Sequence, residues 1–347
     1  MTEERIVVIG ASAGGVDALL SLTKGLPANF PAPICVVLHI PPDSPRLLAK
    51  ILARQSKLNV KEAEDGERYE AGTISIAPPD RHLLVADDGT LHVGRGPREN
   101  RHRPAVDPLF RSVALSHGRR AIGIILSGTL DDGTAGLLAI KQRGGIAIVQ
   151  DPRDAIYPGM PQSAVQNVDV DHVVPLAEMA TRLIEVVQAP PPVRLIKPIV
   201  SDDLPLNVKM AELDHDALEP DERPGRPSPY SCPDCGGVLW KIENNEYLRF
   251  RCRVGHAFSP ETMLRAQDDV LEEALWSALK TLEESARLSR RLAQSERLRG
   301  HAWLAERFEA KERGARQRVE VIRRFLASGS ATAAVEPAGQ AQWQSGG

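Results

Sequence analysis

Aromatic side chains are scarce in this sequence. They make up 4% of the residues, and all four tryptophans (Trp240, Trp276, Trp303 and Trp343) fall in the last third of the chain. No apolar run reaches the roughly eighteen residues that a transmembrane helix needs, so we expect no membrane insertion. The N-terminus also lacks a signal-peptide pattern, which favours a cytoplasmic protein.

An excess of charge of either sign is missing as well. The formal net charge is −3 at pH 7. Bulk electrostatics therefore favours neither nucleic acid nor a membrane surface as a partner, and we expect neither.

Cysteine is rare, but its distribution is uneven. The sequence holds four cysteines, and Cys232, Cys235 and Cys252 lie close together, followed by His256. Two knuckles of this kind at the ends of a short hairpin predict a closed tetrahedral zinc site with no position for substrate. The zinc would be structural, since so short a segment has little core of its own. The alternative is that these cysteines are only buried thiols.

Hydrophobic patterning divides the chain into parts. Short β-branched runs alternate with helical patterns up to about residue 190, which predicts an α/β fold with a doubly wound, mostly parallel sheet and an attached antiparallel hairpin. The expected divisions are a catalytic domain at 1–190, a proline-rich extended linker at 191–229, a zinc-ribbon-like module at 230–258, a helical hairpin at 259–327 and a disordered tail at 328–347.

The helical hairpin has a clear predicted start. Ser259 and Pro260 are suited to the N-cap and first positions of a helix, and Gly300 interrupts the pattern between two apolar stripes. Its many arginines are largely balanced by glutamates, which is typical of a solvated face. We expect a protein-docking role for it rather than nucleic-acid binding.

The stretch Ile6–Ile9 reads as a buried strand that turns sharply at Gly10-Ala11-Ser12 into a helix opening with Gly14 and Gly15. Such a turn places Ser12 at the carboxyl edge of the sheet, facing the N–H groups of a helix start. Glycine-rich turns of this kind more often bind nucleotides, but here a serine occupies the position of the middle glycine.

Two further strands end in residues that suit a serine hydrolase. His39 ends the second strand, and the strand 121–126 leads to Asp131 and Asp132. A histidine can take the proton of a serine hydroxyl, and a carboxylate can orient the imidazole. The carboxyl ends of parallel strands share one edge, so these residues would meet Ser12. A structural histidine and an ordinary Asp-Asp-Gly turn are the alternatives.

A series of motifs supports a specific resemblance over about residues 1–190. They are, in chain order, Gly10-Ala11-Ser12-Ala13-Gly14-Gly15, His39-Ile40-Pro41, the stretch 60–67, Ala77-Pro78-Pro79-Asp80-Arg81-His82, Asn100-Arg101-His102-Arg103-Pro104, Val106-Asp107-Pro108-Leu109-Phe110, Gly133-Thr134-Ala135-Gly136 and Gly159-Met160-Pro161. Together they resemble the catalytic domain of the chemotaxis methylesterase family, the CheB-type enzymes.

The resemblance implies a protein-glutamate methylesterase that acts on the cytoplasmic helices of methylated chemoreceptors, and some members also deamidate glutamines there. It assigns Ser12 as the nucleophile, His39 as the general base and Asp132 as the orienting acid. No cofactor is implied for catalysis. Partners could include a chemosensory methyltransferase or kinase.

Other site residues follow from the same resemblance. Backbone N–H groups of Ala13 and Thr129 would bind the oxyanion, and Arg101, His102 and Arg103 would line the substrate cleft unless they only cap the next helix. Met160 would pack beside the site.

The sequence departs from the family in two places. Residues Gly128-Thr129-Leu130-Asp131-Asp132 stand where Gly-Met-Gly-x-Asp is usual, so Leu130 replaces a glycine. No receiver domain precedes the catalytic strand, so we expect no control by phosphorylation of a built-in receiver.

A different class of function stays open. The first domain could be a weak or inactive scaffold of a chemosensory pathway that acts through its C-terminal protein-binding module. Because every tryptophan lies outside the predicted catalytic domain, metal removal should change tryptophan emission and leave esterase activity intact. The target receptor and the oligomeric state are not predicted.

Overall fold

The computed structural model describes residues 4–191, 204–212, 225–244 and 247–327. The expected disordered tail at 328–347 and most of the expected linker lie outside these ranges. Two compact units divide the chain, one ending at Met263 and the other starting at Leu264.

Alternating strands and helices form the N-terminal part of the first unit. The elements are β1 (Ile6–Ala11), α1 (Gly15–Gly25), β2 (Ile34–Leu38), α2 (Leu48–Ala53), β3 (Asn59–Glu62), β4 (Thr73–Ile76), β5 (His82–Val85), β6 (Leu91–Gly94), α3 (Val106–His117), the 3-10 turn Gly118–Arg120, β7 (Ala121–Ile125), α4 (Thr134–Gln142), β8 (Ile146–Gln150), α5 (Gly159–Asn167), β9 (His172–Val174) and α6 (Leu176–Gln188).

Seven of these strands make one parallel sheet in the order β3-β4-β2-β1-β7-β8-β9. The chain moves outward from β1 to β2 on one side and returns to β7 on the other. The carboxyl end of β1 is therefore a topological switch point, where open α/β sheets bind their ligands. Strands β5 and β6 pair separately as the expected antiparallel hairpin.

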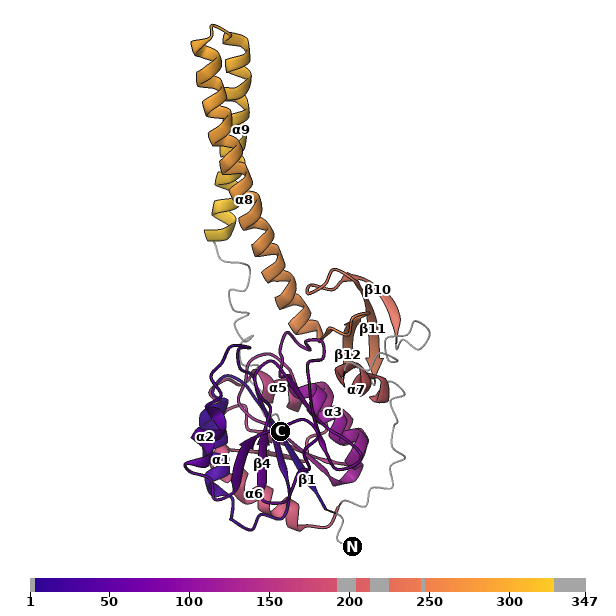
Figure 1. Ribbon diagram of the computed structural model, residues 1–347. Coiled ribbons are helices and arrows are strands. Elements are labelled where there is room, and N and C mark those ends of the chain that lie inside the picture. The colour runs from indigo at the N-terminus through magenta and orange to yellow at the C-terminus, as the bar shows by residue number, and fades with distance from the viewer. Residues whose placement is uncertain (1–3, 192–203, 213–224, 245–246, 328–347) are drawn as a thin grey trace, which may run out of the picture. The chain divides into compact units, whose positions relative to one another are not determined.

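Both faces of the sheet are buried. Val7 and Ile9 of β1 pack with α1, α2 and α6, while Ile6 and Val8 pack on the opposite face with α3, α4 and α5. Successive side chains of a strand point to opposite faces, so a continuous apolar run is what a doubly covered strand requires. Figure 1 shows α1 and α6 on one side of β1 and α3 on the other. The predicted fold class is confirmed.

One expectation is wrong for part of the linker. Residues Leu204–Glu212 form helix α7, in which Leu204, Val208 and Ala211 are buried. Val208 and Ala211 cluster with Leu84 of β5. An apolar stripe at positions i, i+4 and i+7 is enough to dock a short helix, and the surrounding prolines obscured it.

A second, antiparallel sheet follows in the order β10 (Arg226–Ser231), β11 (Val238–Asn244), β12 (Tyr247–Cys252) and β13 (Ala257–Phe258). We call residues 226–258 the Cys/His module. Strands β11 and β12 match the hairpin expected from the sequence. Strand β10 begins at Arg226, inside the stretch that was assigned to the linker.

Two long helices end the described chain, α8 (Pro260–Leu298) and α9 (Ala302–Ala327). Ion pairs join Arg290 to Glu312, Arg297 to Glu309, and Glu283 to Arg323. Partners nearer the start of α8 lie nearer the end of α9, so the helices run antiparallel, as a helical hairpin should. No helix in the described part of the chain is long and apolar enough to cross a membrane.

Candidate active site

The register of the sheet brings Ser12 and His39 together. Ala11 of β1 pairs with Leu38 of β2, and Ser12 and His39 are the residues that follow. The His39 N–H donates to the Ala11 carbonyl at 3.1 Å, and the Ser12 N–H donates to the Ser127 carbonyl at 3.0 Å. Ser12 is thus held between the ends of β2 and β7.

Asp132 lies against His39. His39 Nε2 is 2.7 Å from Asp132 Oδ2, and both side chains are almost fully buried. The Asp132 carboxylate also accepts hydrogen bonds from the Asn100 side chain at 2.8 Å and from the Val106 N–H at 2.7 Å. These donors satisfy an ionised carboxylate, which buried surroundings alone would disfavour.

The electrostatics fixes the protonation of the pair. Burial opposes ionisation of Asp132, but its hydrogen bond and charge interaction with His39 hold its pKa well below the usual range. An ionised carboxylate only accepts, so Nε2 of His39 carries a proton and donates it to Asp132. Nδ1 is buried and has no hydrogen-bond partner among the described residues. This nitrogen can accept a proton from a neighbouring hydroxyl.

His102 fixes the plane of the imidazole. The rings of His39 and His102 stack with 3.7 Å between centroids and 9° between planes. Burial and the neighbouring His39 lower the pKa of His102 to about 3, so His102 is neutral and adds no charge. The sequence suggested His102 only as a cleft residue, because nothing in its spacing indicates the partner.

The loop after β7 shapes the space above Ser12. A Cβ on Gly128 would lie 2.9 Å from the Ser12 Cβ and 2.1 Å from the Met160 sulfur. Met160 is fully buried, which fits the expected packing role. Leu130 has a φ of 60°, the left-handed conformation that glycine favours. The loop therefore keeps a glycine-like backbone at that position despite the substitution.

Of the residues expected at the oxyanion site, Ala13 directly follows Ser12 and Thr129 belongs to the loop after β7. Gly14, at φ 71°, precedes α1, and no side chain caps this helix. The first N–H groups of a helix have no partners within it and attract anions. The Ala13 carbonyl accepts from Ser127 Oγ at 2.8 Å, and Thr129 is exposed in the loop.

Arg103 is held away from the triad by a structural contact. Its guanidinium contacts Asp80 Oδ1 at 2.6 Å and the Gly96 carbonyl at 2.8 Å. Arg101 follows Asn100 in a left-handed backbone conformation, with φ 71°. Their roles as substrate contacts stay predictions.

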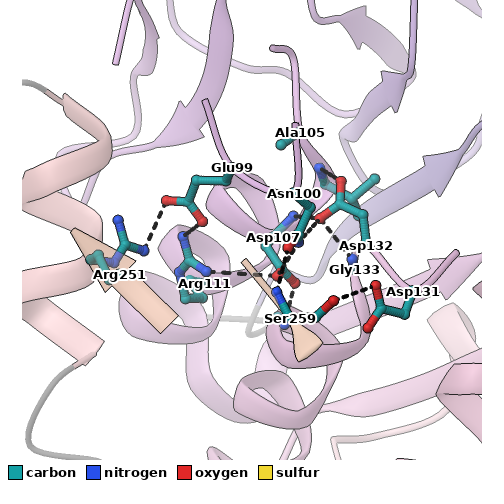
Figure 2. Close-up of polar contacts among 12 residues, drawn as sticks. Glu99, Asn100, Ala105, Asp107, Arg111, Asp131, Asp132, Gly133, Arg251 and Ser259 are labelled. Carbon is teal, nitrogen blue, oxygen red and sulfur yellow. Dashed lines mark hydrogen bonds and ion pairs between the residues drawn. The ribbon is translucent and has the colours of Figure 1, made fainter. Parts of the chain in front are cut away.

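Several buried polar residues around Asp132 were not anticipated from the sequence (Figure 2). Asn100 donates to Asp132 and to Asp107, and Glu99 pairs with Arg111 and Arg251. Burial alone would raise the pKa of Glu99, but the positive charges of these two arginines lower it to about 2. Asn100 lies in one of the motifs that carry the resemblance, but that motif does not indicate its contact with Asp132 or that of Glu99 with Arg251, because these partners are distant in sequence.

Asp131 has surroundings unlike those of Asp132. It accepts hydrogen bonds from Ser259 Oγ at 2.8 Å and from the Tyr247 hydroxyl at 3.3 Å. Burial raises the pKa of Asp131 to about 7. It also borders a cleft of about 460 Å³. Helix α5, with Gln162 and Gln166, and residues of the Cys/His module line this cleft.

The four candidate metal ligands converge. Ligand atoms of Cys232, Cys235, Cys252 and His256 all lie within 4.8 Å of one another. The Cys235 and Cys252 sulfurs are 3.6 Å apart, and His256 Nδ1 is 3.5 Å from the Cys252 sulfur. A tetrahedral site with Zn–S distances of about 2.3 Å separates its sulfurs by about 3.8 Å, so the four residues fit a metal.

Comparison with known proteins gives concordant results. A solved structure titled as the Thermotoga maritima CheB methylesterase catalytic domain is 40% identical, with a TM-score of 0.51, and covers 53% of this chain and 98% of that one. A Geobacter metallireducens protein named protein-glutamate methylesterase/protein-glutamine glutaminase 1 is 44% identical over 183 residues, 52% of this chain and 50% of the relative. A Salmonella typhimurium protein of that enzyme name is 39% identical over 198 residues, 56% of each chain.

The chain spans about half the length of these curated relatives. The family model described as CheB methylesterase matches residues 7–183, which is about half of this chain. The match contains every strand of the parallel sheet except the first residue of β1. With the fold, this match shows that the chain belongs to the CheB methylesterase family.

Proposed function

We propose that this protein hydrolyses glutamyl methyl esters on chemoreceptors, with Ser12 as nucleophile, His39 as general base and Asp132 as the acid that orients it. The observation that carries the proposal is the state of His39. Its Nε2 is bonded to an ionised carboxylate, and its buried Nδ1 has no partner among the described residues. The backbone of His39 lies beside the strand end that bears Ser12.

The first half-reaction forms an acyl-enzyme. His39 Nδ1 takes the proton of the Ser12 hydroxyl as Oγ attacks the ester carbonyl carbon, and Asp132 stabilises the resulting imidazolium. N–H groups of Ala13 at the start of α1 and of Thr129 in the loop bind the oxyanion. Collapse of the tetrahedral intermediate breaks the bond to the methoxy group, which leaves as methanol with the proton from His39.

The second half-reaction restores the enzyme. His39 takes a proton from water, the hydroxide attacks the acyl carbon, and Ser12 leaves with the proton returned by His39. The product is a free glutamate side chain. A glutamine side chain can follow the same route with ammonia as the leaving group, and the names of the curated relatives include this glutaminase activity.

The substrate class has support from the surroundings of the site. Receptor cytoplasmic helices carry acidic and amide side chains, which Arg101, the amides Gln162 and Gln166 and the cleft beside Asp131 could bind. Such a substrate would place the protein in the cytoplasm. A chemosensory methyltransferase or kinase would be a further partner.

A structural zinc ion is the second part of the proposal. Cys232, Cys235, Cys252 and His256 would hold it, and their mutual distances support a closed four-ligand site. Gly236 and Gly255, with φ of 72° and 105°, close the two knuckles around the ligands. A zinc ion with four protein ligands stabilises a fold and leaves no position for substrate, so it takes no part in the hydrolysis.

The test compares full-length Ser12→Ala with the wild type on receptors carrying labelled methyl esters. We expect methanol release to fall at least about 10³-fold, because the nucleophile is removed. Ser21→Ala, on the exposed face of α1, is the matched control and should keep the wild-type rate. Equal release by Ser12→Ala would contradict the serine mechanism. A wild type with no release and no fluorophosphonate labelling of Ser12 would favour the scaffold.

A further inference from the structure

The amide of Asn100 joins the candidate triad to the start of α8 (Figure 2). Its nitrogen donates to Asp132 Oδ1 at 2.8 Å and to Asp107 Oδ2 at 3.1 Å. Its oxygen accepts from the Ser259 N–H at 3.1 Å and from Thr262 Oγ1 at 3.2 Å. A primary amide has two donor hydrogens and two acceptor lone pairs, so all four are used and the amide has one orientation.

The neighbouring residue makes a second connection to the Cys/His module. Glu99 Oε2 pairs with Arg111 of α3 at 2.6 Å, and Glu99 Oε1 pairs with Arg251 of β12 at 3.0 Å. Glu99 is 1% exposed. Arg251 also donates to the Gly255 carbonyl at 2.8 Å, inside the second cysteine knuckle. Removing one of the two cations would leave part of the charge of this buried carboxylate uncompensated, which strongly destabilises a fold. The ion pair between Glu99 and Arg251 therefore holds the segment firmly to the module.

Backbone contacts hold the same segment. Glu99 forms a parallel bridge with Ala257 of β13, and the Asn100 N–H donates to the Ala257 carbonyl at 2.8 Å. Residues 99 and 100 therefore lie along the edge strand of the Cys/His module.

The segment needs this support because its backbone is strained. Asn100 has a φ of 48° and Arg101 a φ of 71°, two consecutive left-handed residues that are not glycine. Such conformations persist only where surrounding contacts impose them. The module supplies several of those contacts.

We infer that the Cys/His module, with the first turn of α8, positions the catalytic carboxylate. The inference rests on the proposed function, in which Asp132 orients His39. Asn100 is a positioning residue: Ser259 and Thr262 fix its oxygen, so its nitrogen faces Asp132 and holds the carboxylate toward His39. Arg251 supports the arrangement by keeping Glu99, and hence residue 100, on the edge of β13. The C-terminal module is part of the catalytic apparatus rather than an independent appendage.

The experiment uses full-length variants with two readouts. Arg251→Gln removes the cation from Glu99, and Asn100→Asp removes the donor to Asp132 while keeping an acceptor for Ser259. Arg253→Gln is the matched control, since Arg253 also flanks Cys252 but is exposed. The readouts are kcat and KM for methanol release from methylated receptor, and the rate of Ser12 phosphonylation by a fluorophosphonate, which requires no receptor.

We expect kcat and the phosphonylation rate to fall about 10- to 100-fold in Arg251→Gln and Asn100→Asp, the effect of misplacing a catalytic group. KM should stay within about twofold, because no substrate contact is removed. Arg253→Gln should match the wild type. If Arg251→Gln does not fold, Thr262→Val removes one donor to Asn100 with little change in volume and should lower both rates about fivefold.

Two results distinguish a failure of the proposed function from a failure of the inference about the Cys/His module. Unchanged methanol release by Ser12→Ala would refute the proposed function itself. A Ser12→Ala variant without activity, beside folded Arg251→Gln and Asn100→Asp variants with wild-type kcat and phosphonylation rates, would overturn the inference and leave the proposed function standing.

Discussion

Two adjacent aspartates show how surroundings set the state of a side chain. Asp132 receives hydrogen bonds from side-chain and backbone N–H groups and is ionised, whereas Asp131 is buried with two hydroxyl donors, Tyr247 and Ser259. Burial raises the pKa of Asp131 to about 7. The pair illustrates why residue type alone does not decide which of two neighbours serves as the acid of a triad.

The raised pKa of Asp131 predicts a pH-dependent stability. Between about pH 4, where an unfolded aspartate titrates, and about pH 7, the folded state binds more protons, so the free energy of unfolding falls as pH rises. Asp131→Asn cannot ionise and should escape this loss. The free energy of unfolding of Asp131→Asn minus that of the wild type should therefore rise by roughly 1 to 3 kcal/mol from pH 5 to pH 8, as measured by urea unfolding at both values.

The matched control is Asp43→Asn, which removes an exposed carboxylate and should show the wild-type pH dependence. A difference between Asp131→Asn and the wild type that is the same at pH 5 and pH 8 would contradict a raised pKa.

Leu130 shows a limit of sequence reasoning at this scale. Its replacement of a glycine was visible, but the sequence could not show whether the loop would change shape. The backbone keeps the left-handed conformation, at a cost of roughly 1–2 kcal/mol. Gly159 lies close enough that an added Cβ would be 2.8 Å from the Leu130 nitrogen, so contacts on the other side of the loop leave little room for another path.

At the scale of elements, periodic patterns predicted most of the fold. The five central strands of the parallel sheet (β4, β2, β1, β7 and β8), the hairpin of β5 and β6, and the start of α8 at Ser259 and Pro260 follow from local signals. The short edge strands β3 and β9 were not predicted. Ser259 Oγ accepts the Thr262 N–H at 3.0 Å, as an N-cap should. Its additional bond to Asp131 could not be predicted, because capping residues are recognised from local sequence alone.

Helix α7 gives a test of an element that the sequence concealed. Val208 is buried against Leu84, so Val208→Ala should lower the free energy of unfolding by about 2 kcal/mol, the value of two buried methyl groups with a small cavity. Denaturant midpoints would measure this. Lys209→Ala, on the exposed side of the same helix, should change little. Equal midpoints for Val208→Ala and the wild type would mean that α7 is not docked in solution.

At the scale of the molecule, the strand ends predicted that Ser12, His39 and Asp132 share one edge of the sheet. The structure places the backbones of Ser12 and His39 side by side and bonds His39 to Asp132, while the catalytic roles of the three residues stay predictions. The same reasoning could not find Asn100, Glu99 or Arg251. Their contacts join residues up to 162 positions apart and follow no period. Buried polar networks of this kind depend on the complete packed structure, which a single sequence does not display.

These contacts reverse one expectation about metal removal. If the modules were independent, a chelator would leave the esterase active. Because the Cys/His module holds Glu99 and Asn100, we now expect chelation to lower the Ser12 phosphonylation rate about 10- to 100-fold, together with loss of bound zinc and a change in tryptophan emission.

Zinc added back should restore all three signals, and a Cys232→Ser, Cys235→Ser double variant should resemble the chelated protein without chelator. Full loss of zinc with an unchanged phosphonylation rate would separate metal binding from the triad.

The bond between Asn100 and Ser259 also has a consequence for protein synthesis. Its two residues are 159 positions apart, and ribosomes add about 5–20 residues per second. Asp132 is made before Ser259 as well, so for roughly 6 to 25 s a nascent chain has Ser12, His39 and Asp132 but not the N–H group that fixes Asn100. An esterase whose alignment depends on residue 259 stays poorly active while it is still attached to the ribosome, and it acquires full activity only when the later part of the chain has been made.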